Sequence, residues 1–369
     1  MAERLNWLDN NFIDRDLYAP FIVKSDVDYY DDLCKRYRTL LNDARNAGAD
    51  LESLHIIKKY TRTIREALNE YYKGLISTSH TKVKNLIKDC MDESLAVDTL
   101  ANSDAFGGVK GTEIQFFRAR VSTSAIPYTA KEMLHLPFKM RGKTGNYRFS
   151  IPGVPSLYLG NSSYACWLEL GRPAEHDFVV SPVLLDGEQR IFNLAVMNRD
   201  YHRLGEFKPD RVHTWLKLLI LMIATSYRIE EEGRVFKSEY IISQSIMLAC
   251  NELGLDGVAY YSKRVDDQMF SQAAINLALF AIYRYGNDYS GICEHIKIDD
   301  SFNYSLFRQL GQPSIYRGYD LRCMHTGFVN MIGNYKRQYE YQFTNFCEFD
   351  KFLFSGWEKD KIEFGHAVK

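Results

Sequence analysis

The chain has 369 residues, a length that suggests two or three domains with sizeable hydrophobic cores. Its 46 lysines and arginines almost balance its 47 aspartates and glutamates, and the formal net charge of −1 excludes a strong long-range attraction to nucleic acid or to an anionic membrane. Any anion-binding site must therefore be built from local groups, and we expect neither nucleic acid nor a membrane as a partner.

The seven cysteines indicate a reducing compartment. They are widely separated, odd in number and without zinc-ligand spacing, which is typical of free thiols: Cys34, Cys90, Cys166, Cys250, Cys293, Cys323 and Cys347. The longest apolar stretch, residues 215–224, contains Lys217 and is far shorter than the ~20 residues that a membrane helix needs. The charged start of the chain has no apolar signal core. These features predict a cytoplasmic protein that binds no metal.

Residues 1–112 have the pattern of a helical bundle. Apolar residues recur at helical spacing among charged residues over 27–47 and 51–75, and we expect a third helix at about 81–99. Three glycines and several small polar residues at 102–111 then indicate a linker or hinge. We therefore expect residues 1–112 to form an accessory or regulatory helical domain that controls access to a site elsewhere in the chain.

From residue 113 the pattern changes to short strands separated by proline and glycine. The run 178–185 is expected to form a strand, and longer helices are expected at about 209–229 and 240–253. This irregular mixture predicts an α+β fold rather than a regular alternation of strands and helices. The segment 311–369 is rich in tyrosine and phenylalanine, so we expect it to pack on the core or at an interface.

Five polar residues are of the types that a charged dinucleotide requires: Arg118, Arg148, Tyr158, Glu169 and Ser262. Arginine presents a planar fork of donors that grips a diphosphate bidentately. A tyrosine ring offers a face against which nicotinamide can stack. A carboxylate can hold a ribose hydroxyl and stabilise an oxocarbenium-like transition state, and a serine hydroxyl can orient a phosphate or ribose oxygen.

The spacing of these residues favours a common site. A short strand at 157–159 followed by the start of a helix would place Tyr158 and Glu169 at the opening of the same site. A strand over 115–120 would put Arg118 and Arg120 on the same face, because side chains alternate along a strand. The two arginines would then share one diphosphate.

The short motifs around these residues, in this order, resemble the motifs of the RES family. The family is named for its arginine, glutamate and serine and is known as a group of NAD-degrading toxins. The resemblance covers roughly residues 113–310. It extends to the helix that carries Gln244, to the Gly-Asp-Gly turn before Ser262, and to the closing phrase that contains Asn276. The resemblance implies a catalytic domain with an ADP-ribosyltransferase-like mixed core.

The resemblance also implies an enzyme whose substrate is NAD and which passes the ADP-ribosyl group to phosphate or water. It implies catalytic roles for Glu169, Arg118 and Ser262. The residues expected to contact the substrate are Arg118, Arg148, Tyr158, Gln244, Ser262 and Asn276. The interval between Arg118 and Arg148 is longer than in compact members of the family and contains Arg141. Arg120 or Arg141 could therefore take the place of one of the two expected arginines.

Two other functions stay open at this point. The related fold also supports mono-ADP-ribosylation of a protein target, and a protein without enzymatic activity could use a RES-like core only to bind a nucleotide. Compact members of the family are held by a neighbouring antitoxin. The expected partners are therefore an antitoxin or another regulatory protein, in a toxin–antitoxin or antiphage-defence setting, and a second copy of the chain.

Overall fold

The computed structural model has a mixed α+β architecture, which confirms the fold class predicted from the sequence. It describes residues 7, 17, 19–106, 113–123, 126–196, 208–231, 233–264, 274–310, 328–330 and 338–355. Residues 107–111 of the predicted linker and much of the aromatic segment 311–369 lie outside this part of the chain.

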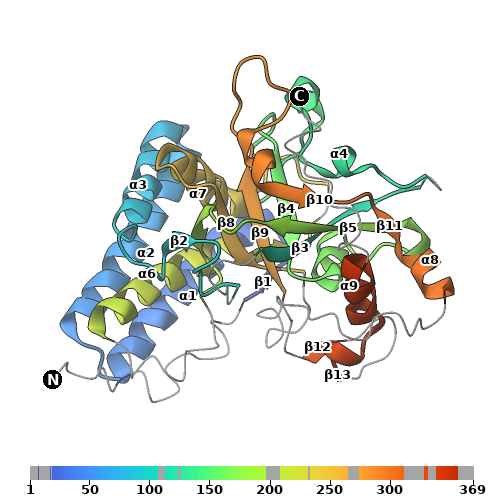
Figure 1. Cartoon of the computed structure of the whole chain (residues 1–369). Coiled ribbons are helices and arrows are strands. Elements are labelled where there is room, and N and C mark those ends of the chain that lie inside the picture. The colour runs from blue at the N-terminus through green and yellow to red at the C-terminus, as the bar shows by residue number, and fades with distance from the viewer. Residues whose placement is uncertain are drawn as a thin grey trace.

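A sheet of nine described strands lies at the centre of the molecule (Figure 1). Its order is β10 (Ile296–Ile298), β5 (Phe178–Leu185), β3 (Ile114–Val121), β4 (Ser156–Gly160), β9 (Ile275–Phe280), β8 (Gly257–Tyr261), β6 (Arg190–Asn193) and β2 (Val97–Thr99), with β11 (Phe302–Asn303) also paired to β5. Its paired strands are antiparallel, apart from β6 and β8, which run parallel. The strand predicted at 178–185 is confirmed as β5.

Two short strand pairs lie outside this sheet. The first is parallel and joins β1 (Phe21–Val23) to β7 (Tyr227–Ile229), and the second is antiparallel and joins β12 (Phe328–Asn330) to β13 (Gln338–Glu340).

Five helices lie together on one side of the molecule (Figure 1): α1 (Asp26–Asn46), α2 (Leu51–Tyr72), α3 (Ile76–Lys88), α6 (Pro209–Thr225) and α7 (Ile241–Glu252). The α6 helix is apolar and buried around most of its circumference. Two tyrosines of α1 fix its position against α6, since the hydroxyl of Tyr29 donates to the carbonyl of Ala224 and that of Tyr37 to the carbonyl of Ile220, both at 3.0 Å.

The helices of the N-terminal segment share one hydrophobic core with the sheet. This core contains Leu33 and Ile64 from α1 and α2, Leu219 from α6, and Leu277 from β9. In addition, β2 belongs to the first 112 residues and pairs with β6 in the main sheet. The two regions are thus packed against each other over a wide face, and the division of the chain at residue 112 stays a prediction.

A second core covers the opposite face of β3 and β5. It is formed by α5 (Ser163–Glu169), α8 (Tyr304–Gln309) and α9 (Asn345–Ser355), which contribute aromatic side chains such as Phe346 and Phe349. Side chains of β5 alternate between the two cores: Val183 and Leu185 enter the first, while Val180 and Leu184 enter the second. This explains why the strand is buried along its whole length.

The remaining helical turns are short. They are α4 (Ala130–Met133) and the 3-10 turns at Phe138–Lys143, Glu175–Asp177, Ser238–Tyr240, Gly291–His295 and Tyr341–Phe343.

Two predicted helices end earlier than expected. The third helix spans Ile76–Lys88 instead of about 81–99, since turns follow Lys88 and 97–99 form β2, which hydrogen-bonds to β6. The helix that starts at Pro209 stops at Thr225 instead of 229, because 227–229 form β7 and pair with β1. In both places pairing with a distant strand overrides the local helical pattern.

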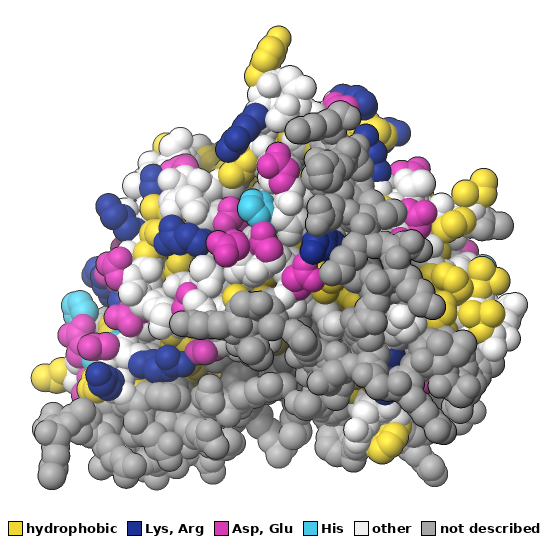
Figure 2. All heavy atoms as spheres, in the orientation of Figure 1, with side chains coloured by type: hydrophobic (Ala, Val, Ile, Leu, Met, Phe, Trp, Pro, Cys, Tyr) yellow, Lys and Arg dark blue, Asp and Glu magenta, His cyan; other side chains and the backbone are white. Residues whose placement is uncertain are grey.

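On the face shown in Figure 2, basic and acidic side chains are interspersed over the described residues, as the near balance of charge leads one to expect. None of the helices in the described ranges combines the length and the apolar character that a membrane crossing requires.

Candidate active site

A cavity of about 610 Å³ opens where β3, β4 and the start of β9 meet the end of α5. Among the described residues that line it, seven are cationic: Arg118, Arg120, Lys143, Arg148, Lys237, Lys263 and Arg264. Glu169 is the single carboxylate among them, and Tyr128, Tyr147, Tyr158, Tyr240 and Tyr260 supply aromatic surface. The cavity is therefore strongly basic within a chain that is nearly neutral overall.

The two arginines of β3 both line this cavity, while Phe117 and Ala119 enter the second core, which confirms that the arginines lie on one face of the strand. Arg118 donates through Nε to the carbonyl of Met133 at 3.3 Å and through Nη1 to the carbonyl of Tyr158 at 3.0 Å. Arg120 donates to the carbonyl of Leu134 at 3.2 Å, while its Nε is buried without a hydrogen-bond partner among the described residues. Burial and the neighbouring Arg120 lower the pKa of Arg118 to about 10.

Arg148 lies at the wall of the cavity and is only 6% exposed. It donates to the carbonyl of Tyr261 at 2.8 Å and to the hydroxyl of Ser226 at 3.2 Å, and its guanidinium lies 4.7 Å from the centre of the Tyr260 ring. Its Nε is buried and has no hydrogen-bond partner within the described part of the chain. Burial lowers the pKa of Arg148. The protein therefore satisfies the hydrogen-bonding groups of this arginine only in part within the described residues.

Gln244 supports the loop that carries Arg148 instead of lining the cavity. From α7 its side-chain amide donates to the side chain of Asn146 at 2.6 Å and to the carbonyls of Tyr147 and Ser150 at 3.1 and 3.3 Å. The structure therefore places Gln244 behind the site, where it contacts the loop 146–150 and does not line the cavity.

Tyr158 and Glu169 both line the cavity, from β4 and α5 respectively. The expectation that Glu169 lies at a helix start was wrong, since it is the last residue of α5. The helix begins right after β4, where Ser162 caps it by accepting from the backbone N–H of Ala165 at 3.0 Å. The seven residues of α5 make two turns, which carry Glu169 back to the cavity.

Gly160 permits this tight connection. A Cβ at this position would come within 2.8 Å of Cys166 Sγ and 3.2 Å of the Ser162 carbonyl, so a larger residue would push α5 away from the end of β4. Gly160 also pairs with Asn276 in the register of β4 and β9. Asn276 is thereby placed to donate from Nδ2 to Glu169 Oε1 at 2.8 Å.

The Tyr158 ring is held in place at both ends. Its hydroxyl accepts a hydrogen bond from the backbone N–H of Phe149 at 3.2 Å, and its ring makes an edge contact with Tyr147 at a centroid distance of 6.0 Å. Burial raises the pKa of Tyr158, which makes its hydroxyl a weaker acid than that of a free tyrosine. The residue presents an aromatic surface to the cavity.

Ser262 and Arg141 do not line the cavity. Ser262 follows β8 directly, is 1% exposed, and accepts a hydrogen bond from the backbone N–H of Arg264 at 3.1 Å, which fixes the turn after the strand. Arg141 donates to the carbonyl of Phe138 and lies 4.8 Å from the centre of the Tyr283 ring. Of the two substitutes considered for the expected arginines, Arg120 therefore lies in the cavity and Arg141 does not.

The three lysines of the cavity and Arg264 belong to none of the sequence motifs that predicted the site. Lys263 and Arg264 directly follow Ser262, so the motif that contains Ser262 could have indicated them. Lys237 comes from the segment before α7 and donates to the carbonyl of Asn146 at 3.3 Å. Its position had no signal in the sequence, because it depends on how α7 packs beside the Arg148 loop.

The described part of the aromatic C-terminal segment packs behind α5. Asp350 of α9 is buried and accepts from the backbone N–H of Ser163 at 3.1 Å and from the hydroxyl of Tyr341. The C-terminal helix thus anchors the start of the helix that ends at Glu169. Elsewhere in the described ranges, no three histidine, cysteine, aspartate or glutamate side chains gather in the way that a metal ion would require.

Comparisons with known proteins agree with the motifs. Residues 119–284 match the RES domain, so the predicted resemblance is confirmed for this part of the chain. The chain is 33% identical over 166 residues to the putative toxin YopC of Bacillus subtilis (strain 168). This match covers 42% of the chain and spans only 37% of the length of that relative.

Among solved structures, the crystal structure of the M. tuberculosis MbcT–MbcA toxin–antitoxin complex aligns over 62% of this chain and 96% of the matched chain. The sequence identity is 11% and the TM-score is 0.31, a likeness too loose to support a functional argument.

Proposed function

We propose that the RES domain carried by residues 119–284 of this chain makes it an enzyme that cleaves the bond between nicotinamide and ribose in NAD, with phosphate or water as the acceptor. The observation that carries the proposal is the cavity, whose described lining residues include seven lysines and arginines and one carboxylate. A protein with this activity would act as a toxin or a defence effector in the cytoplasm, and its NAD consumption would need restraint by an antitoxin or another regulatory protein.

The arginines are suited to the diphosphate of NAD. Arg120 and Arg148 line the cavity, and each has a buried Nε without a hydrogen-bond partner among the described residues, so an anion in the cavity would compensate guanidinium groups that the protein satisfies only in part. Arg118 lines the cavity, and its contacts through Nε and Nη1 to two backbone carbonyls hold the guanidinium in a fixed orientation. A diphosphate oxygen between these groups would receive charge-assisted hydrogen bonds.

Glu169 is suited to the ribosyl centre. When the glycosidic bond breaks, its electron pair moves to the ring nitrogen of nicotinamide, which leaves as a neutral molecule, and positive charge develops on the ribose. A carboxylate next to the ribose stabilises that charge and can hold a ribose hydroxyl. Asn276 fixes one carboxylate oxygen, and within the described part of the chain the other oxygen has no hydrogen bond that would keep it from the substrate. The positively charged nicotinamide needs no general acid to leave.

The other predicted residues take supporting roles in this proposal. Tyr158 offers its ring to nicotinamide, and Asn276 holds Glu169. Gln244 fixes the Arg148 loop, while Ser262 shapes the turn that carries Lys263. A direct contact between the Ser262 hydroxyl and a phosphate or ribose oxygen stays a prediction.

Product analysis tests the proposal. The purified full chain is mixed with NAD, with and without inorganic phosphate, and the nucleotides are separated by chromatography. Release of nicotinamide with ADP-ribose, or with its phosphorylated form when phosphate is present, supports the proposal. Labelled ADP-ribose retained on a protein band would instead identify a mono-ADP-ribosyltransferase. If no nicotinamide is released, the result favours a protein that binds a nucleotide without cleaving it.

A further inference from the structure

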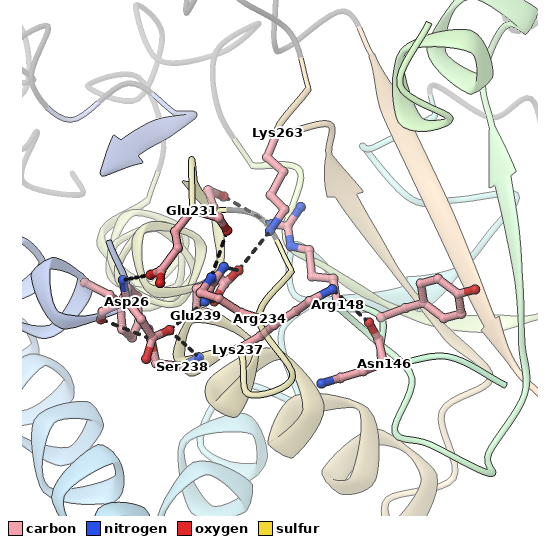
Figure 3. Close-up of polar contacts among 12 residues, drawn as sticks. Asp26, Asn146, Arg148, Glu231, Arg234, Lys237, Ser238, Glu239 and Lys263 are labelled. Carbon is pink, nitrogen blue, oxygen red and sulfur yellow. Dashed lines mark hydrogen bonds and ion pairs between the residues drawn. The ribbon is translucent and has the colours of Figure 1, made fainter. Parts of the chain in front are cut away.

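Lys263 occupies a position in the cavity wall that the proposed chemistry leaves without a role. It follows Ser262 after β8, is 8% exposed and lines the same cavity as Arg148 and Glu169. Figure 3 shows its side chain directed toward Glu239. An ammonium group at such a site has lost most of its water and depends on nearby groups for its charge.

The carboxylate nearest to Lys263 is already shared. Lys263 Nζ lies 3.9 Å from Glu239 Oε1 and 4.3 Å from the centre of the Tyr240 ring. Glu239 is itself 3% exposed and accepts two hydrogen bonds from Arg234, at 3.0 and 3.2 Å. Arg234 in turn donates to Asp26 of α1 at 2.6 Å. Because Arg234 is the closer partner of Glu239, the carboxylate compensates only part of the charge on Lys263.

The charged and titratable groups around Lys263 come from several elements. The turn before α7 supplies Glu239 and Tyr240, and α5 supplies Glu169 at a longer range. Arg148 and Arg264 are like charges that oppose the protonated form of Lys263. Burial is the largest influence, and together with these cations it outweighs Glu239 and lowers the pKa of Lys263 to about 7.

We propose that Lys263 is a further anion-binding group of this cavity, which takes up a proton from solvent when a nucleotide diphosphate binds. The proposal rests on the proposed function, because it assumes that the ligand of the cavity carries a diphosphate. Without ligand, a neutral Lys263 reduces the repulsion among the arginines of the cavity. With ligand, the added negative charge favours the ammonium form, so the full positive charge arises only when it is needed.

The test uses the full chain and ADP-ribose, which carries the diphosphate and has no nicotinamide bond to cleave. Calorimetric titrations at pH 7 in buffers of low and high ionisation enthalpy measure the protons bound per ligand. We expect an uptake of about half a proton, since a group with a pKa near 7 is half protonated before binding. The Kd should also rise by up to about tenfold per pH unit above pH 7, where binding requires a proton from solvent.

Two variants assign the proton to Lys263. Lys263→Met should abolish the uptake and weaken binding, and Lys263→Arg should abolish the uptake while keeping a permanent charge, so one of them informs even if the other fails to fold. Lys237→Met is the matched control, because it removes another lysine of the same cavity that is partly exposed and donates to a carbonyl. It should leave the uptake near half a proton.

Uptake that persists in both Lys263 variants overturns the proposal, and so does ADP-ribose binding to the parent chain without proton uptake, or no binding at all. Nicotinamide release from NAD is measured in parallel. Release together with proton-neutral ADP-ribose binding overturns the role of Lys263 alone. Proton-linked binding without release supports Lys263 as an anion-binding group and contradicts the proposed reaction.

Discussion

The side-chain amide of Asn276 donates a hydrogen bond to Glu169 Oε1 at 2.8 Å and so joins the start of β9 to the end of α5. Asn276 is buried, while Glu169 lies at the cavity wall. The pair fixes the orientation of the one carboxylate among the described residues that line the basic cavity. Glu169 is accordingly the residue on which the proposed reaction depends most.

Glu169→Ala should lower the rate of NAD cleavage by about 100- to 1,000-fold, the typical cost of losing one preorganised electrostatic group. The measurement is nicotinamide release by the parent and the variant under the same conditions. Glu175→Ala, which removes an exposed glutamate of a nearby 3-10 turn, is the control and should retain full activity. A Glu169→Ala rate within about threefold of the parent rate would exclude this carboxylate from the mechanism.

Asn276 should act as a positioning residue, and Asn276→Ala should lower kcat by about tenfold with little change in KM, because one hydrogen bond to a charged group is lost. Asn276→Asp gives a sharper readout. It keeps the size of the side chain but replaces the amide donor by a carboxylate that repels Glu169, so kcat should fall further than in Asn276→Ala. A kcat of Asn276→Asp equal to that of the parent would contradict a positioning role.

Arg118→Lys should weaken the binding of ADP-ribose by roughly tenfold or more although the charge is kept, since the fork of donors and its two backbone contacts are lost. Calorimetry with the full chain measures the Kd. Arg308→Lys, at an exposed position of α8, is the control. An unchanged Kd for Arg118→Lys would transfer the diphosphate role to Arg120 or Arg148.

Asp350 should make the stability of the fold depend on pH. Burial raises its pKa from 3.8 to about 7, so between these values the folded state binds more protons than the unfolded state. Stability therefore falls as the pH rises through this window and is constant above it. Asp350→Asn keeps an acceptor for the Ser163 N–H and removes the titration. The parent Tm should decline relative to that of the variant between about pH 4 and about pH 7. Parallel Tm curves of the two proteins would show that the pKa of Asp350 is not raised.

Removal of residues 1–112 should leave the cavity residues in the chain but uncover the apolar surfaces of α6 and α7 and the edge of β6. We expect the 113–369 fragment to aggregate or to melt at a lower temperature than the full chain, as exposed apolar patches and strand edges lead to association. Size-exclusion chromatography and thermal melting compare the two proteins. A monomeric fragment with the Tm of the full chain would identify residues 1–112 as an independent domain.

Local patterns were sufficient to predict much of this protein. The helical period of apolar residues indicated the first two helices, and the continuous apolar run that ends before Asp186-Gly187 indicated β5. The order of the arginine, tyrosine and glutamate motifs indicated the RES domain. Alternation along a strand correctly put Arg118 and Arg120 on one face. These features depend on neighbours within a few positions, which a sequence displays directly.

Other features were decided only by the tertiary structure. Pairing of β2 with β6 and of β7 with β1 shortened two helices, and the packing of α7 brought Gln244 behind Arg148. The environment of Lys263 is the clearest case. Lys263 is buried beside Glu239, which pairs with Arg234, and Arg234 pairs with Asp26. These contacts bring together parts of the chain that are distant in sequence. The charge state of a side chain depends on its solvation and on the charges around it, and for this lysine both were fixed only when the helices closed around the sheet.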